Sequence, residues 1–119
     1  FEWGWHADYP DPANFLFLLY GPQRQANNSS GSSANNAANY ENAEYDRLFE
    51  QMKDMEDGIL RQQIIDRMVD ILRHDSPWLW GYHPKDYGLY HAWFSNVKPN
   101  RISNNNMKYY RIDPLLREQ

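Results

Sequence analysis

Residues 42–76 read NAEYDRLFEQMKDMEDGILRQQIIDRMVDILRHDS, and they carry the clearest structural pattern of the chain. Apolar residues recur in it at spacings of three, four and seven, the period of an amphipathic α-helix. Asp57-Gly58 interrupts the pattern, so we predict a pair of helices, with Asn42 capping the first and Asp57 capping the second. The apolar stripe of the first helix consists of Tyr45, Leu48, Phe49, Met52 and Met55.

The second helix of this pair has a wider apolar face, which predicts that it is mostly buried. Pro77 ends this helix at or before Ser76, because proline disfavours helical backbone in the residue before it. The predicted face consists of Leu60, Ile64, Ile65, Met68, Val69, Ile71 and Leu72.

Upstream of the pair, the chain predicts a strand, a short helix and a long loop. Residues 1–6 (FEWGWH) alternate aromatic with small or polar side chains, as a strand does. Residues 13–20 (ANFLFLLY) predict a helix with Asp11 as its N-cap, ended by Gly21-Pro22. Residues 23–39 are rich in Asn and Ser and predict a flexible, exposed loop with nothing to bury.

Downstream, residues 78–112 predict a hairpin and a final strand. Its arms are residues 78–83 and 87–91, joined through Pro84, and residues 107–112 form the last strand. Trp78, Trp80 and Tyr82 then share one face, as core or as the wall of a cleft. The element order predicts a mixed α/β fold in a single segment, residues 1–119.

The amino-acid composition excludes some kinds of function and favours others. The 119 residues carry a formal charge of -4, which argues against binding to nucleic acid. There is no cysteine, hence no thiolate nucleophile and no Cys-ligated metal. Aromatic residues make up 16% of the chain, a composition that suits a binding cleft or an interface.

The densest group of chemically useful residues is His6, Asp8 and Asp11, among Trp and Tyr side chains. His6 and Asp8 could contribute to a metal site, and two nearby carboxylates could do acid–base work. We interpret Asp11 as a turn and cap residue, and Asp8 as an anchor for a cation at the edge of a cleft. No catalytic or phosphate-binding motif occurs, so we predict no enzyme activity, no cofactor and no metal.

The segment GWHADYPDPANFL, residues 4–16, resembles the G-W-x-x-D-x-x-x-P-x-x-F signature of the extracellular solute-binding proteins of family 5. These are the oligopeptide-, dipeptide- and nickel-type receptors of ABC importers. Further blocks of the chain resemble later family segments in the same order. They are Asn36 with NYENAEYDRL (39–48), Arg61 through DSPW (75–78), LYHAW (89–93) and MKYYRID (107–113).

The resemblance implies that the chain is the C-terminal portion of a two-lobed, periplasmic-binding-protein-like (type II) fold. The N-terminal lobes of the parent chain then lie outside this segment, which starts at Phe1 without Met. It further implies a periplasmic or extracellular, membrane-associated receptor that passes a peptide or small-molecule ligand to a membrane permease. A piece of a larger domain is expected to leave an apolar face uncovered or to self-associate through it.

The resemblance also suggests roles for single residues. The backbone of Gly4 and His6 would pair with the backbone of a peptide ligand, and Asp8 would bind its free amine. Trp5 would form part of the cleft wall, and Asn36 would lie near the cleft. The chain departs from the family at residues 78–82, where WLWGY replaces the usual I-P-L-Y.

The function that the sequence predicts is therefore reversible binding of a peptide or another amine-bearing solute. One alternative is a carbohydrate-binding module, because Trp and Tyr platforms also stack on sugar rings. A second alternative is a metal-dependent hydrolase that uses His6, Asp8 and Asp11.

Overall fold

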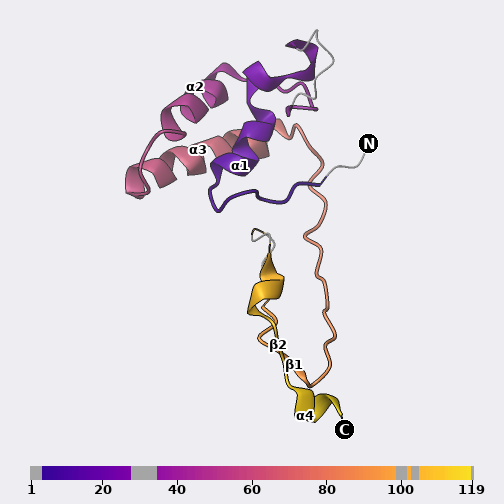
Figure 1. Ribbon diagram of the computed structural model, residues 1–119. Helices are drawn as coiled ribbons and strands as arrows, with labels where there is room; N and C mark the ends of the chain where they lie inside the picture. The colour runs from indigo at the N-terminus through magenta and orange to yellow at the C-terminus, as the bar shows by residue number, and fades with distance from the viewer. Residues whose placement is uncertain (1–3, 28–34, 99–101, 103–104, 119) are drawn as a thin grey trace. The chain divides into compact units, whose positions relative to one another are not determined.

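The computed structural model describes residues 4–27, 35–98, 102 and 105–118. It consists of two compact units, Phe1–Trp80 and Gly81–Gln119, and each is described by itself (Figure 1). The first unit is helical and contains the predicted ligand-binding residues. The second contains a short antiparallel ribbon.

Three α-helices pack together in the first unit: α1 (Ala13–Leu16), α2 (Ala43–Met52) and α3 (Ile59–Asp75) (Figure 1). The predicted helix over residues 13–20 is α-helical only in its first turn and continues as a 3₁₀ turn, Phe17–Leu19. Two further 3₁₀ turns follow, Gly21–Gln23 and Gln25–Asn27.

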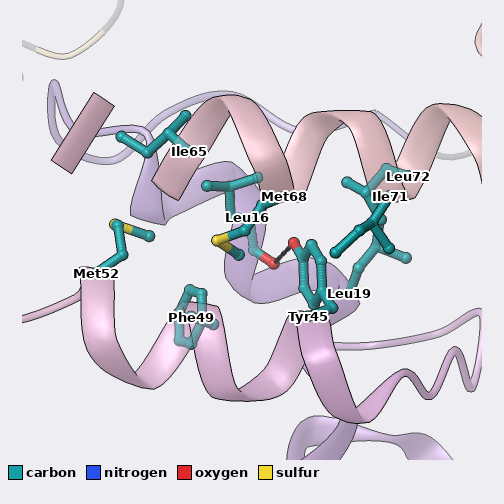
Figure 2. Close-up of a cluster of buried hydrophobic side chains, with 9 residues drawn as sticks. All are labelled: Leu16, Leu19, Tyr45, Phe49, Met52, Ile65, Met68, Ile71 and Leu72. Carbon is teal, nitrogen blue, oxygen red and sulfur yellow. Dashed lines mark hydrogen bonds between the residues drawn. The ribbon is translucent and has the colours of Figure 1, made fainter. Parts of the chain in front are cut away.

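The core lies where these three helices meet, as Figure 2 shows. Tyr45 is fully buried there, and its hydroxyl donates a hydrogen bond of 2.7 Å to the carbonyl oxygen of Leu16 (Figure 2). Burial raises the pKa of Tyr45, so the hydroxyl keeps its proton and α1 stays tied to α2. The core residues are Leu16, Leu19, Tyr45, Phe49, Met52, Ile65, Met68, Ile71 and Leu72.

The ends of the helical pair agree with the sequence in two places. The Oδ1 atom of Asn42 accepts hydrogen bonds from the backbone N–H groups of Glu44 and Tyr45, at 3.0 and 3.1 Å. At the other end, α3 stops at Asp75, and Ser76 turns into the left-handed region at φ 46°. The predicted cap at Asn42 and the predicted stop before Pro77 are therefore confirmed.

The start of α3 differs from the prediction. Gly58 precedes the helix and no side chain caps it, so the predicted cap at Asp57 is wrong. Leu60 was expected in the core but is 69% exposed, whereas its neighbour Arg61 is only 4% exposed. Asp57 does not cap the helix because its Oδ1 is paired with the guanidinium of Arg61 at 2.5 Å.

Arg61 also binds Asp11, which lies 50 residues earlier in the chain. Its Nη2 donates to both carboxylate oxygens of Asp11 at 2.8 Å, and its Nε donates to the carbonyl of Met52 at 3.3 Å. Asp11 accepts a hydrogen bond from the backbone N–H of Ala13 at 2.7 Å, but the N-cap position of α1 is Pro12, so the N-cap predicted at Asp11 is one residue too early. The hydrogen bond from Arg61 lowers the pKa of Asp11, so the carboxylate stays charged.

The C-terminal end of α3 is held by Asp75. Its carboxylate contacts His74 Nδ1 at 3.0 Å, the Tyr40 hydroxyl at 2.5 Å and Asn42 Nδ2 at 2.9 Å. These hydrogen bonds, that of His74 foremost, lower the pKa of Asp75 to about 2. Asn42 therefore caps α2 with its oxygen and fixes the end of α3 with its nitrogen.

The second unit contains a two-stranded antiparallel sheet, β1 (Phe94–Ser95) and β2 (Arg111–Ile112), with Phe94 opposite Ile112. A 3₁₀ turn, Asn106–Tyr109, precedes β2, and a short helix α4 (Pro114–Arg117) follows it. The predicted final strand is therefore present only in its last two residues, because its beginning is helical.

The other predicted strands are absent from the described residues. Residues 78–83 and 87–91 form neither strand nor hairpin. Residues 4–6 form no strand, and residues 1–3 lie outside the described part of the chain. Alternation alone does not make a strand, since its backbone groups also need a partner to pair with.

The three aromatic residues expected on one face have different surroundings. Trp78 is half-buried and packs against the helical core, whereas Trp80 is 57% and Tyr82 79% exposed. The mixed α/β class and the two-lobed architecture remain predictions from the sequence.

The buried ion pair gives a first prediction. Replacing Asp11 with Asn leaves the guanidinium of Arg61 buried with less compensating charge, so we expect a loss of about 2–3 kcal/mol in the free energy of unfolding. The Asp57→Asn variant is the matched control, because Asp57 is 92% exposed and its pairing is screened by water. Urea unfolding of both variants is the measurement, and equal losses would contradict the prediction.

Asp75 gives a second prediction, about pH. Its folded-state pKa of about 2 lies below its ordinary value of 3.8, so the charged form stabilises the fold above about pH 4. This contribution is lost as the pH falls toward 2. We expect the Asp75→Asn variant to be less stable than the natural chain near neutral pH, and the difference to shrink on acidification. Urea unfolding measures the free energy of unfolding of both proteins across this pH range. If the difference between them does not change with pH, the prediction is wrong.

Candidate ligand-binding site

Trp5 and Asp8, two of the predicted ligand-binding residues, meet at the side chain of Asn14. Asn14 is 2% exposed and lies in the first turn of α1. Its Oδ1 accepts hydrogen bonds from Trp5 Nε1 at 2.9 Å and from the backbone N–H of Asp8 at 3.0 Å. Its Nδ2 approaches Asp8 Oδ2 at 3.4 Å. We call these three residues the Asn14 cluster.

The chemistry of the partners fixes the orientation of the Asn14 amide. An indole N–H and a backbone N–H can only donate, so the atom that both contact must be the amide oxygen. The amide nitrogen then faces the carboxylate of Asp8, to which it can donate. The cluster thus orients the carboxylate from one side.

Two contacts hold α1, and with it Asn14, against the rest of the unit. The carbonyl of Leu16 accepts from Tyr45 of α2, and Asp11 just before α1 binds Arg61 of α3. The indole of Trp5 packs edge-on against Phe17, with ring centroids 5.5 Å apart. The position of the Asn14 cluster is therefore fixed by α1 and its contacts with α2 and α3.

Asp8 itself is exposed to solvent. Among the described residues, only Asn14 donates to its carboxylate, which leaves most of its acceptor positions open to a ligand. Gly4 and His6 are also exposed, and neither pairs its backbone with another described residue. Gly4, His6 and Asp8 lie within five residues of one another, so one ligand can contact all three.

Asn36, the fifth predicted residue, belongs to a different network. It is fully buried, and its Nδ2 donates to the carbonyls of Tyr20 at 3.1 Å and Tyr40 at 2.9 Å. Its Oδ1 accepts from the backbone N–H of Tyr40 at 3.1 Å. These bonds use most of the amide's capacity, so the side chain of Asn36 joins two chain segments in this structure.

Asn36 also changes the interpretation of the predicted loop at 23–39. Its backbone pairs with residues 23–25 in an isolated parallel bridge to Arg24, and a 3₁₀ turn covers Gln25–Asn27. The expectation that nothing in the loop is buried is thus wrong at Asn36. The middle of the loop, residues 28–34, lies outside the described residues.

A cavity of about 260 Å³ opens beside the start of α3. Arg61 lies on it, but its guanidinium is already bound to two carboxylates and one carbonyl. The cavity therefore offers no unpaired cation to an anionic ligand. Its walls are Pro12, Asp57, Gly58, Arg61, Gln62 and Ile65.

The structure does not gather the three residues of the alternative metal site. Within residues 4–27, 35–98, 102 and 105–118, no three His, Asp or Glu side chains come close enough to hold a metal ion. Asp11 instead faces the cation of Arg61.

Asn14 and Arg61 are the two residues of this region that sequence reasoning did not single out. Asn14 stood inside the apolar run ANFLFLLY, where its polar side chain was a visible exception. Arg61 stood between two predicted core residues, and a cation at that place normally faces solvent. In both cases the useful signal was a polar residue inside a buried pattern.

The chain matches no model of a known protein family, no curated protein and no solved structure. In the part of the chain that the structure describes, no helix has the length and apolar character needed to cross a membrane.

The Asn36 network gives a third prediction. The Asn36→Ala variant removes the partner of partly buried backbone groups of Tyr20 and Tyr40, so we expect it to lose about 1–3 kcal/mol of unfolding free energy. Asn35→Ala is the matched control, because the hydrogen bond of Asn35 to Gln23 is long, at 3.4 Å, and exposed. Chemical unfolding compares the two, and a neutral Asn36→Ala would show that its amide bonds do not support the fold.

Proposed function

We propose that this chain belongs to the substrate-binding component of an ABC importer, and that it reversibly binds a peptide or another amine-bearing solute. The observation that carries the proposal is the exposed carboxylate of Asp8, held beside Trp5 by the Asn14 cluster. In this proposal Asp8 binds the ligand's ammonium group, and no bond is made or broken.

The carboxylate suits a cation for two reasons. An ammonium group donates three hydrogen bonds, and a carboxylate has several acceptor positions to receive them. The neighbouring indole adds an apolar wall, which limits the water around the ion pair and strengthens it.

The backbone around the cluster suits a peptide. Gly4 and His6 are exposed, and their backbone groups pair with no other described residue, so an extended ligand can hydrogen-bond alongside them. Closure of two lobes over the ligand, as in other two-lobed receptors, would then remove water from the Asp8 contact. Delivery to a membrane permease follows from the same proposal.

Asn36 is not part of the proposed site, because its amide is engaged by the backbone of Tyr20 and Tyr40. The ligand-contacting residues in this chain are Gly4, Trp5, His6 and Asp8.

The test is calorimetric titration of the protein expressed from its complete gene. We expect triglycine with a free amine to bind, and its N-acetylated form to bind more weakly. The Asp8→Asn variant keeps the side-chain volume but removes the charge, so its affinity for triglycine should fall by about thirtyfold or more. Affinity for the N-acetylated peptide should change little.

Asp54→Asn is the matched control, because it removes one exposed negative charge two residues after the end of α2. It should bind both peptides as the natural protein does. Asp11 cannot serve as this control, since it stabilises Arg61. Equal affinity of the natural protein for the free and acetylated peptides overturns the proposal. Tight binding of maltotriose that survives Asp8→Asn would instead support the carbohydrate alternative.

A further inference from the structure

The side chain of Asn14 has an unusual position for a polar group. It is 2% exposed in the first turn of α1, and Leu16 of the same turn packs into the core. A buried side-chain amide normally forms its hydrogen bonds with the backbone groups around it, as Asn36 does. Asn14 instead directs its three hydrogen bonds toward Asp8, six residues earlier, and Trp5, nine residues earlier.

The arrangement constrains Asp8 at two points. Asn14 Oδ1 fixes the backbone of Asp8 through its N–H at 3.0 Å, and Nδ2 faces the carboxylate oxygen Oδ2 at 3.4 Å. The same Oδ1 holds the indole of Trp5 at 2.9 Å. One buried group therefore sets the relative positions of the anion and the aromatic wall.

We propose that Asn14 is a positioning residue, which orients the Asp8 carboxylate beside Trp5 and so sets the preference of the site for a free amine. This inference rests on the proposed function. A carboxylate on an exposed stretch otherwise rotates among several orientations, and a ligand then has to restrict it at an entropic cost. Asn14 restricts it in advance.

A purely structural role predicts something different. If Asn14 only stabilised α1, its removal would weaken the binding of all ligands together, in proportion to the unfolded fraction. A positioning role predicts that the ratio of affinities for the free and N-acetylated peptides changes. That ratio is independent of the concentration of folded protein.

The experiment measures this ratio for triglycine and N-acetyl-triglycine with the protein expressed from its complete gene. Asn14→Leu has a similar size and removes all three hydrogen bonds, so we expect the ratio to fall by about tenfold or more. Asn14→Ser is a smaller, polar second variant, whose short hydroxyl cannot reach all three partners. The same direction of change is expected for it, even if Asn14→Leu fails to fold.

Tyr45→Phe is the matched control. It removes the hydrogen bond to the carbonyl of Leu16 and so destabilises the same helix without touching the Asn14 cluster. We expect it to lower the unfolding midpoint but to leave the affinity ratio unchanged.

The failures of the two proposals are distinguishable. If Asp8→Asn abolishes the preference for the free amine while both Asn14 variants keep it, the positioning role is wrong and the proposed function stands. If the natural protein shows no preference at all, the proposed function fails and the inference fails with it. A fall in the ratio for Tyr45→Phe as large as for the Asn14 variants would also overturn the inference.

Discussion

The contact on which the first unit depends is the pairing of the buried guanidinium of Arg61 with Asp11. A cation placed in the interior must have its charge compensated, because the loss of hydration would otherwise exceed what packing returns. The pair joins the turn before α1 to the start of α3. Tyr45 then fixes the other end of α1 through the carbonyl of Leu16.

Two buried asparagines show how the same side chain can serve different ends. The side-chain amide of Asn36 donates hydrogen bonds to the backbone carbonyls of Tyr20 and Tyr40, and so joins the segments before and after the Asn/Ser-rich stretch. The side-chain amide of Asn14 forms hydrogen bonds with Trp5 and Asp8, and the carboxylate of Asp8 stays exposed at the surface. A buried amide whose hydrogen bonds go to surrounding backbone groups has a structural role. A buried amide whose hydrogen bonds go to exposed side chains can instead order a binding surface.

The helical pair could be predicted because its signals are local. The apolar period and the cap at Asn42 depend only on neighbouring residues. The inward turn of Arg61 could not be predicted, since it depends on Asp11, which lies 50 residues away. The strands expected within residues 78–91 failed for a related reason, because alternation does not supply a pairing partner.

The candidate site was predictable to a similar extent. The motif at residues 4–16 singled out Trp5 and Asp8, and the structure brings them together through Asn14. Asn36 was assigned to the site by its place in a motif, but its burial and its bonds give it another role. Whether a polar residue faces a ligand or the backbone depends on tertiary packing, which a spacing pattern does not contain.

The backbone pairing of Asn36 with residues 23–25 has a consequence for how this chain tolerates insertions and deletions. The pairing closes the base of the Asn/Ser-rich stretch, so the two ends are fixed whatever number of residues lies between them. Closing a longer loop costs little, about 0.6 kcal/mol for each doubling of its length. A change in the length of this stretch should therefore alter the free energy of unfolding only slightly, provided that the amide at its base is kept.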